Sequence, residues 1–204
     1  MLNAGVIGAG HLGKIHLKLL NQSDKYNLVG FYDSNPEAAK NISEEFGYRS
    51  YKTMESLIED CDMVDVVTPT LYHSDCAKKV LNAGKHLFIE KPITKTVQEA
   101  EEIRELAKKN GVRGQVGQVE RFNPAFTAVN NQIVNPMFIE AHRLAEFNPR
   151  GTDVSVVLDL MIHDIDAILS VVNSKVKTVT ANGVSVISQT PDIANARIEF
   201  ETGC

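Results

Sequence analysis

A glycine-rich hexapeptide, Gly-Ala-Gly-His-Leu-Gly at residues 8–13, lies between an apolar run and a helical pattern near the start of the chain. The run Leu2–Ile7 predicts a β-strand, and the apolar spacing over His11–Gln22 predicts an α-helix. In this setting the first glycine permits a tight turn, the second lets the backbone approach a ligand, and the third lets helix and strand pack closely. The hexapeptide therefore predicts a strand–turn–helix unit with exposed N–H groups where the helix begins.

The same alternation continues through the first half of the chain, which predicts repeated β-α-β units and a parallel sheet. The strands are nearly continuous apolar runs, as expected when helices cover both faces of a sheet. The further predicted strands are Leu28–Tyr32, Met63–Val67, His86–Ile89 and Val112–Gln118. The further predicted helices are Pro36–Phe46, Ser74–Ala83 and Val97–Asn110. The expected fold class is α/β, with a doubly wound parallel sheet of the Rossmann type.

The pattern changes after Gly117, where Asn-Pro pairs at residues 123–124, 135–136 and 148–149 indicate turns. We place a domain boundary between residues 118 and 122, which gives domains 1–119 and 120–204. The predicted helices of the second domain are Pro124–Ile133 and Ser155–Val172, and its predicted strands are Phe138–Leu144, Val176–Ser188 and Ala194–Phe200. We expect a mixed α+β domain with a largely antiparallel open sheet.

Composition excludes several classes of partner. Among 204 residues, 21 Lys and Arg oppose 26 Asp and Glu, and the net charge of −5 argues against binding to nucleic acid or to an anionic membrane. No apolar run approaches the roughly 18 residues that span a bilayer, and no signal sequence precedes the first strand, so we expect a cytoplasmic protein. The number and spacing of Cys61, Cys76 and Cys204 indicate neither a disulfide framework nor a metal site.

An acidic residue, Asp33, follows the second predicted strand twenty residues after Gly13. This is the arrangement in which a carboxylate binds the ribose hydroxyls of a dinucleotide, while its pyrophosphate lies at the start of the first helix. The carboxylate would repel a 2′-phosphate, and the next residues, Ser34-Asn35-Pro36, supply no Arg to neutralise one, which favours NAD over NADP. The alternative is a glycine-rich turn without a ligand. The expected cofactor residues of this region are Gly8, Gly10, His11, Leu12, Gly13 and Asp33.

The tripeptide Glu90-Lys91-Pro92 directly follows the apolar strand His86–Ile89. Ligands of open parallel sheets bind outside the carboxyl ends of the strands, so we expect Lys91 to point into the cofactor cleft. Pro92 restricts Lys91 to an extended backbone. The alternative is a solvated surface lysine.

The predicted helix Ser155–Val172 carries a narrow ionisable stripe. At about 100° per residue, Asp159, His163 and Asp166 lie within about 60° of one another on an otherwise apolar helix. The segment contains no Lys or Arg, and His163 lies one turn from a carboxylate able to orient it, which favours acid–base chemistry over a plain solvent face. Asp164 projects toward the apolar side, and we interpret it as a buried structural acceptor.

These three motifs, in this order, resemble the Gfo/Idh/MocA family of oxidoreductases over essentially the whole chain. The runs Val119–Pro124 and Val156–Asp166 most resemble the branch that includes UDP-N-acetylglucosamine 3-dehydrogenase. The resemblance implies a Rossmann domain followed by a domain for substrate binding and for assembly into dimers or tetramers. Family members are generally longer than this chain, so we expect the second domain to be incomplete at its C-terminus.

The resemblance also assigns residues. Thr68, Pro69, His73, Glu90 and Lys91 are expected near the cofactor, and Arg121, Asn123, Asp159 and His163 near a sugar-type substrate. For a UDP-sugar, Arg121, Arg143 or Arg150 would pair with the phosphates, although a structural role for each is equally compatible with the sequence.

The implied reaction is hydride transfer between the nicotinamide of NAD and a secondary hydroxyl of a sugar, cyclitol or nucleotide sugar. His163 is the candidate base, with Asp159 orienting it or binding a neighbouring sugar hydroxyl. Lys91 would hydrogen-bond the reacting oxygen or pass the proton onward, and either His163 or Lys91 takes the proton first. Two alternatives stay open: a glycoside hydrolase that uses bound NAD transiently, and a catalytically silent NAD-binding protein.

Overall fold

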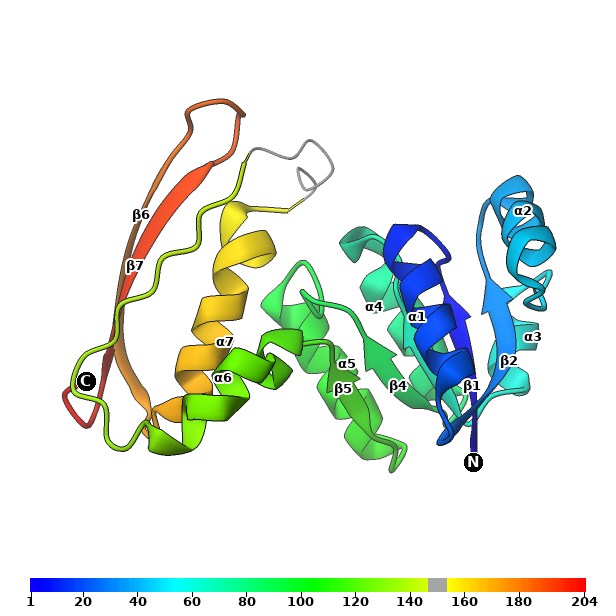
Figure 1. Ribbon diagram of the computed structural model, residues 1–204, viewed down its shortest axis with the longest axis horizontal. Coiled ribbons are helices and arrows are strands. Elements are labelled where there is room, and N and C mark those ends of the chain that lie inside the picture. Colours follow the sequence, from blue (N-terminus) through cyan, green and yellow to red (C-terminus); the bar gives the residue numbers. More distant parts are fainter. Residues whose placement is uncertain (147–153) are drawn as a thin grey trace. The chain divides into compact units, whose positions relative to one another are not determined.

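The computed structural model describes residues 1–146 and 154–204 and divides the chain into two compact units, Met1–Gly117 and Gln118–Cys204 (Figure 1). Each unit has its own sheet.

The first unit is built on a parallel sheet of five strands in the order β2-β1-β3-β4-β5. The strands are β1 (Leu2–Ile7), β2 (Tyr26–Tyr32), β3 (Met63–Val66), β4 (His86–Ile89) and β5 (Gly114–Val116). The predicted parallel sheet is confirmed. Strand β2 begins two residues before the predicted start, and β5 is shorter than predicted at both ends.

Helices connect these strands. They are α1 (His11–Gln22), α2 (Pro36–Phe46), α3 (Met54–Glu59), α4 (His73–Asn82) and α5 (Val97–Lys109), with a short 3-10 turn η1 (Thr70–Tyr72) before α4. Local capping explains several boundaries: Asn35 caps α2, and Thr96 and Glu99 form a reciprocal capping box on α5. The predicted helices are confirmed, whereas α3 was not predicted.

The sheet is covered on both faces (Figure 1). Because side chains alternate along a strand, Ile7 packs with α3, α4 and α5 on one face, and the adjacent Val6 packs with α1 and α2 on the other. On β3, Val64 and Val66 belong to the first face. The intervening Asp65 therefore lies on the face covered by α1, an unusual place for an acid.

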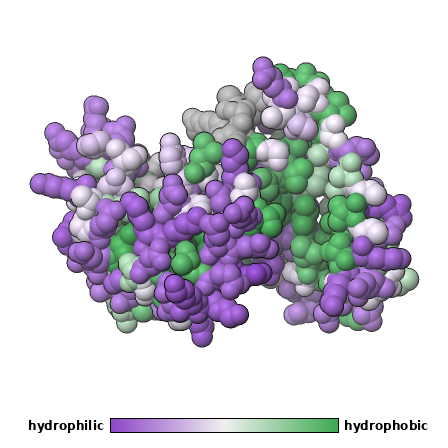
Figure 2. Space-filling model, turned by 180° about the vertical axis from the view of Figure 1, so that it is seen from behind, coloured by the Kyte–Doolittle hydropathy of each residue, from purple (hydrophilic) through white to green (hydrophobic). Residues whose placement is uncertain are grey.

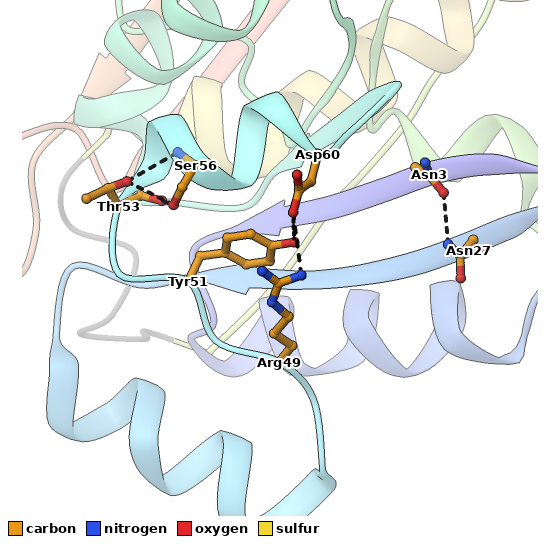
Figure 3. Close-up of polar contacts among 7 residues, drawn as sticks. All are labelled: Asn3, Asn27, Arg49, Tyr51, Thr53, Ser56 and Asp60. Atoms are coloured by element: carbon orange, nitrogen blue, oxygen red, sulfur yellow. Dashed lines mark hydrogen bonds and ion pairs between the residues drawn. The ribbon is translucent and has the colours of Figure 1, made fainter.

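The helix α3 is anchored by a polar cluster beside β2 (Figure 3). Tyr51 donates a hydrogen bond of 2.6 Å to the carboxylate of Asp60, and Arg49 lies over the Tyr51 ring at 4.2 Å. Burial and the Asp60 hydrogen bond raise the pKa of Tyr51 to about 12. Thr53 caps α3 by accepting the Ser56 N–H. This cluster anchors α3, which is too short to show a helical repeat of hydrophobic residues.

The second unit begins with the short helical segments η2 (Val119–Phe122), α6 (Pro124–Val129) and η3 (Asn130–Gln132). Further along lie a π-helical turn η5 (Val157–Met161), the helix α7 (Ile162–Val171), and the antiparallel strands β6 (Val176–Val184) and β7 (Ile193–Phe200). The predicted antiparallel pair is confirmed. The predicted helix Ser155–Val172 is instead a π turn followed by an α-helix.

The predicted strand Phe138–Leu144 is wrong. The segment has no strand assignment, and Phe138 and Leu144 are 77% and 93% exposed. A strand needs a hydrogen-bonded neighbour, and within the described residues of this unit β6 and β7 pair only with each other. The alternating pattern of the segment therefore produces an extended chain without a ladder.

Apolar side chains lie on the surface of the second unit, where Figure 2 shows broad hydrophobic areas. The exposed apolar residues of β6, β7 and the turn between them include Val179, Val184, Val186, Ile187 and Ile193. In the ranges 1–146 and 154–204, no helix combines the length and the apolar character that crossing a membrane requires.

Candidate active site

The glycine loop has the geometry that its spacing predicts. Gly8 has a φ of +93°, and a Cβ there would lie 2.8 Å from the Val67 carbonyl oxygen. A Cβ at Gly13 would collide with the Gly8 carbonyl oxygen, whereas a Cβ at Gly10 would meet no atom within 4 Å. Two glycines are thus required by crowding inside the loop, and Gly10 leaves open space beside the start of α1.

The start of α1 is suited to an anion. Gly10 is the N-cap residue, no side chain caps the helix, and its first turn contains no acid. The backbone N–H groups there carry the positive end of the helix dipole, which favours a phosphate. His11 and Leu12, the next residues, are both exposed. The loop fits the pyrophosphate of a dinucleotide.

Asp33 lies at the end of β2 and already has two backbone partners. Its Oδ2 accepts the Ala9 N–H at 2.8 Å, and its Oδ1 accepts the Asn35 N–H at 2.8 Å. A carboxylate accepts about four hydrogen bonds, so capacity for ribose hydroxyls is left. Asp33 is half-buried, and the same side chain that fits a ribose also fastens the glycine loop. The sequence did not indicate this second role.

Thr68, Pro69 and His73 follow β3 and differ in exposure. Thr68 is half-buried and Pro69 is exposed, which suits residues that flank a cofactor. His73 is 1% exposed, and its two ring nitrogens lie 2.8 Å from the carbonyl oxygens of Thr68 and Pro92. The His73 ring thus joins two loops, and its expected place beside the cofactor stays a prediction.

Glu90, Lys91 and Pro92 form the turn after β4. The Glu90 N–H donates to the Val66 carbonyl at 3.0 Å, which continues the sheet ladder, and the Lys91–Pro92 peptide bond is cis. The Glu90 Oε2 accepts the Lys91 N–H at 3.1 Å. Glu90 is buried and Lys91 is half-buried. The turn therefore places Lys91 at the carboxyl ends of β3 and β4, the edge that also carries the glycine loop.

A residue missed by the sequence analysis, His16 of α1, contacts this turn. Its Nδ1 lies 2.8 Å from Asp65 Oδ2 and its Nε2 lies 3.4 Å from Glu90 Oε1. The available signal was an acid inside the apolar strand Met63–Val66, since a buried carboxylate requires a partner.

The second unit holds the other expected catalytic residues. Asp159 lies in the π turn η5, His163 lies in the first turn of α7, and both are half-buried. A π turn holds more residues than an α turn, so the assumed 100° per residue does not apply through this segment. Such turns inside helices occur frequently at functional sites.

The remaining acids of α7 are bound by arginines. Asp166 is buried and accepts two hydrogen bonds of 2.6 Å from the Arg121 guanidinium. Asp164 accepts two bonds, of 3.0 and 2.9 Å, from Arg143 and retains 22% side-chain exposure. The interpretation of Asp164 as an acceptor is correct, but its predicted burial is wrong because Arg143 pairs with it near the surface.

The two arginines therefore have structural partners within this unit, and the pKa of each is raised by its hydrogen bond to an aspartate. Asn123 caps α6 by accepting the Ala125 N–H at 3.0 Å and donates to Glu120. Arg150 lies outside the described residues. These contacts supply the structural role that the sequence left open for Arg121 and Arg143.

Comparison with known proteins identifies the family to which this chain belongs. Residues 2–118 match the GFO_IDH_MocA oxidoreductase family, described as having an NAD-binding Rossmann fold. The chain belongs to this family. The match spans β1 through β5 and includes the glycine loop, Asp33 and the Glu90-Lys91-Pro92 turn. The expected family resemblance and fold class are confirmed.

Similarity to individual proteins extends into the second unit. UDP-N-acetylglucosamine 3-dehydrogenase of Acidithiobacillus ferrooxidans is 34% identical over 207 residues, which covers 99% of this chain and 64% of that protein. A solved structure of that enzyme has a TM-score of 0.93 at 33% identity and covers 99% of this chain and 66% of its own. The scyllo-inositol 2-dehydrogenase (NAD(+)) of Bacillus subtilis is 28% identical over 221 residues, 99% of this chain and 65% of that protein. The chain thus spans about two thirds of these relatives.

Proposed function

We propose that this protein is an NAD-dependent dehydrogenase that oxidises a secondary hydroxyl of a sugar, a cyclitol or a nucleotide sugar, or reduces the corresponding ketone. The observation that carries the proposal is the glycine loop with Asp33, which fits a dinucleotide in a chain of an NAD-binding oxidoreductase family. We assign residues 1–119 to cofactor binding and 120–204 to substrate binding.

The residues that would hold NAD come from the first unit. The loop Gly8–Gly13 would bind the pyrophosphate through backbone N–H groups, and Asp33 would accept hydrogen bonds from the adenosine ribose. Thr68 and Pro69, which follow β3, would flank the same cofactor. Bound NAD supplies the hydride acceptor or donor of the reaction. The acidic Asp33 supports a preference for NAD over NADP.

Proton transfer would be performed by the protein's own side chains. As hydride leaves a secondary alcohol, carbonyl character develops and a base must take the hydroxyl proton. We assign this role to His163, with Asp159 as its orienting partner, and assign Lys91 to hydrogen bonding with the reacting oxygen. The reverse division, with Lys91 as the first proton acceptor, is the alternative that a test must separate.

A UDP-sugar oxidised at C3 is our candidate substrate, supported by the name of the A. ferrooxidans relative and its coverage of 99% of this chain. Free cyclitols are the competing class, supported by the name of the B. subtilis relative. Because Arg121 and Arg143 pair with aspartates, we do not assign them to the substrate phosphates. Asn123 remains a proposed substrate contact.

The test combines binding with turnover. The purified chain and NAD are mixed with one substrate per sample: UDP-N-acetylglucosamine, free N-acetylglucosamine, scyllo-inositol or myo-inositol. NAD binding is measured by calorimetric titration, and the formation of reduced nicotinamide is followed by its absorbance. The proposal predicts reduced nicotinamide with one of these substrates. Release of an aglycone from a glycoside without net NADH would show the NAD-using hydrolase instead. NAD binding without any conversion would show a silent homologue.

A further inference from the structure

The imidazole of His16 lies between two carboxylates beneath the cofactor edge of the first unit. Its Nδ1 is 2.8 Å from Asp65 Oδ2, on β3, and its Nε2 is 3.4 Å from Glu90 Oε1, directly after β4. The Phe88 ring lies 6.1 Å from the His16 ring, centroid to centroid. Asp65 is 3% exposed and Glu90 is 9% exposed, so this arrangement is internal.

This geometry favours a positive charge on the ring. A neutral imidazole has one N–H, so one of its nitrogens would present a lone pair to a carboxylate, whereas an imidazolium donates from both nitrogens. The hydrogen bonds to Asp65 and Glu90 outweigh the effect of burial and raise the pKa of His16 to about 10. For Glu90, burial is outweighed by the His16 hydrogen bond and the Lys91 N–H, and its pKa is lowered. His16 therefore supplies the charge that favours the ionised form of Glu90, whereas burial still raises the pKa of Asp65 despite its hydrogen bond to His16.

Glu90 transmits this arrangement to Lys91. One carboxylate oxygen of Glu90 faces His16 while the other accepts the Lys91 N–H at 3.1 Å. The position opposite Glu90 is a glycine: a Cβ on Gly117 would lie 2.7 Å from Glu90 Oε1. The Glu90 side chain thus contacts the His16 cation on one side, and on the other it occupies space that a side chain at residue 117 would fill.

We propose that His16 is a positioning residue, which, paired with Asp65, holds the Glu90 carboxylate in place and thereby fixes the backbone of Lys91 at the cofactor edge. His16 touches neither cofactor nor substrate in this account. The proposal rests on the proposed function only in the role given to Lys91, because the contacts among His16, Asp65, Glu90 and the Lys91 N–H exist in the chain without ligands.

The first test reads the protonation state directly. Long-range proton–nitrogen NMR of the uniformly labelled chain at pH 8 distinguishes an imidazolium from either neutral tautomer. We expect both His16 nitrogens to be protonated at pH 8. A neutral His16 at pH 8 would overturn the proposal, whatever the chain does to a sugar.

The second test reads the effect on Lys91. In His16→Gln the hydrogen exchange of the Lys91 amide should rise about tenfold, because the carboxylate that accepts it loses its fixed position. The Val67 amide, which donates to the Ile7 carbonyl at 2.8 Å, reports the stability of the unit and should not change in parallel. The control is Lys79→Gln, which removes a cation from the exposed ion pair with Glu55 in the same unit and should leave the Lys91 amide unaltered.

A second variant keeps the test decisive if His16→Gln fails to fold. Gly117→Ala leaves His16 and Asp65 intact but displaces the Glu90 carboxylate, and Gly117 does not need a positive φ. It should speed Lys91 exchange in the same way.

Where the wild-type chain turns over a substrate, both variants should lower kcat about tenfold with KM for NAD within about twofold. Unchanged Lys91 exchange in folded Gly117→Ala and His16→Gln would overturn the proposal. An inactive wild-type chain with the expected exchange would contradict only the proposed function.

Discussion

At the scale of single residues, Asp33 has two tasks, because it accepts backbone N–H groups of the glycine loop and is the proposed acceptor for the ribose hydroxyls. We predict that Asp33→Arg weakens NAD binding by about tenfold or more and shifts the preference toward NADP, since a carboxylate is replaced by a cation. Calorimetric titration of both cofactors measures this shift. Asp33→Asn, which keeps an acceptor without the charge, is the control. An unchanged ratio of the two affinities in Asp33→Arg would exclude Asp33 from the ribose site.

His163 tests the proposed division between cofactor and proton transfer. We expect His163→Ala to lower kcat by about a hundredfold or more, the range of a general base, with NAD affinity nearly unchanged. His142→Ala, which alters an exposed histidine of the same unit, is the control. Steady-state kinetics and NAD titration on the same samples measure both quantities. An equal loss of NAD affinity would contradict the assignment.

The pKa of His16 gives a pH dependence of stability. Its folded value of about 10 exceeds the ordinary value of 6.5, so the folded chain binds an extra proton between these values. The contribution of His16 to the free energy of unfolding is therefore complete below about pH 6.5 and is lost as the pH rises through about 10. Urea unfolding at several pH values should show the free energy of unfolding falling over this window. The fall should be smaller in His16→Gln, and an identical fall would contradict a charged His16.

At the scale of elements, α3 depends on the hydroxyl of Tyr51. Tyr51→Phe removes its 2.6 Å bond to Asp60 while keeping the ring beneath Arg49, so we predict a loss of about 1 kcal/mol in the free energy of unfolding. Tyr72→Phe, at an exposed ring, should change it by less than about 0.5 kcal/mol. Denaturant titration of both variants measures the difference. Equal stabilities would show that the Asp60 bond contributes nothing.

The sequence predicts elements best where its signal is local and periodic. The glycine loop, the apolar strands β1, β3 and β4, and α5 with its capping box all carry such signals, and the structure contains them. The segment Phe138–Leu144 alternates like a strand, but a strand also requires a neighbour, which no local pattern reveals. The helix α3 was missed because six residues are too few for a clear period.

Site residues follow the same rule. Gly8, Gly13 and Asp33 could be proposed as cofactor residues because their motif has a fixed spacing. The contact between His16 and Asp65 joins residues 49 positions apart, and only the alternation of β3 and the packing of α1 bring them together. Likewise, the partners of Asp164 and Asp166 come from distant segments, so an ionisable stripe on one helix could not reveal them.

At the scale of the whole molecule, the described part of the second unit exposes apolar side chains on a two-stranded sheet, and such a surface is typical of an interface. We propose that the protein forms a homo-oligomer through β6 and β7. Sedimentation equilibrium should then give a mass above that of one chain, and Val179→Lys, in the middle of β6, should lower it. Lys18→Glu on α1 is a surface control in the other unit. A single-chain mass at all concentrations would contradict the proposal.

The central claim is that the first unit binds a dinucleotide at the glycine loop and prefers NAD. Calorimetric titration of NAD and of NADP into the unmodified chain tests this claim most directly. The structure predicts saturable NAD binding with one site per chain and clearly weaker binding of NADP, because Asp33 accepts hydroxyls and repels a phosphate. Absence of NAD binding, or tighter binding of NADP, would contradict it.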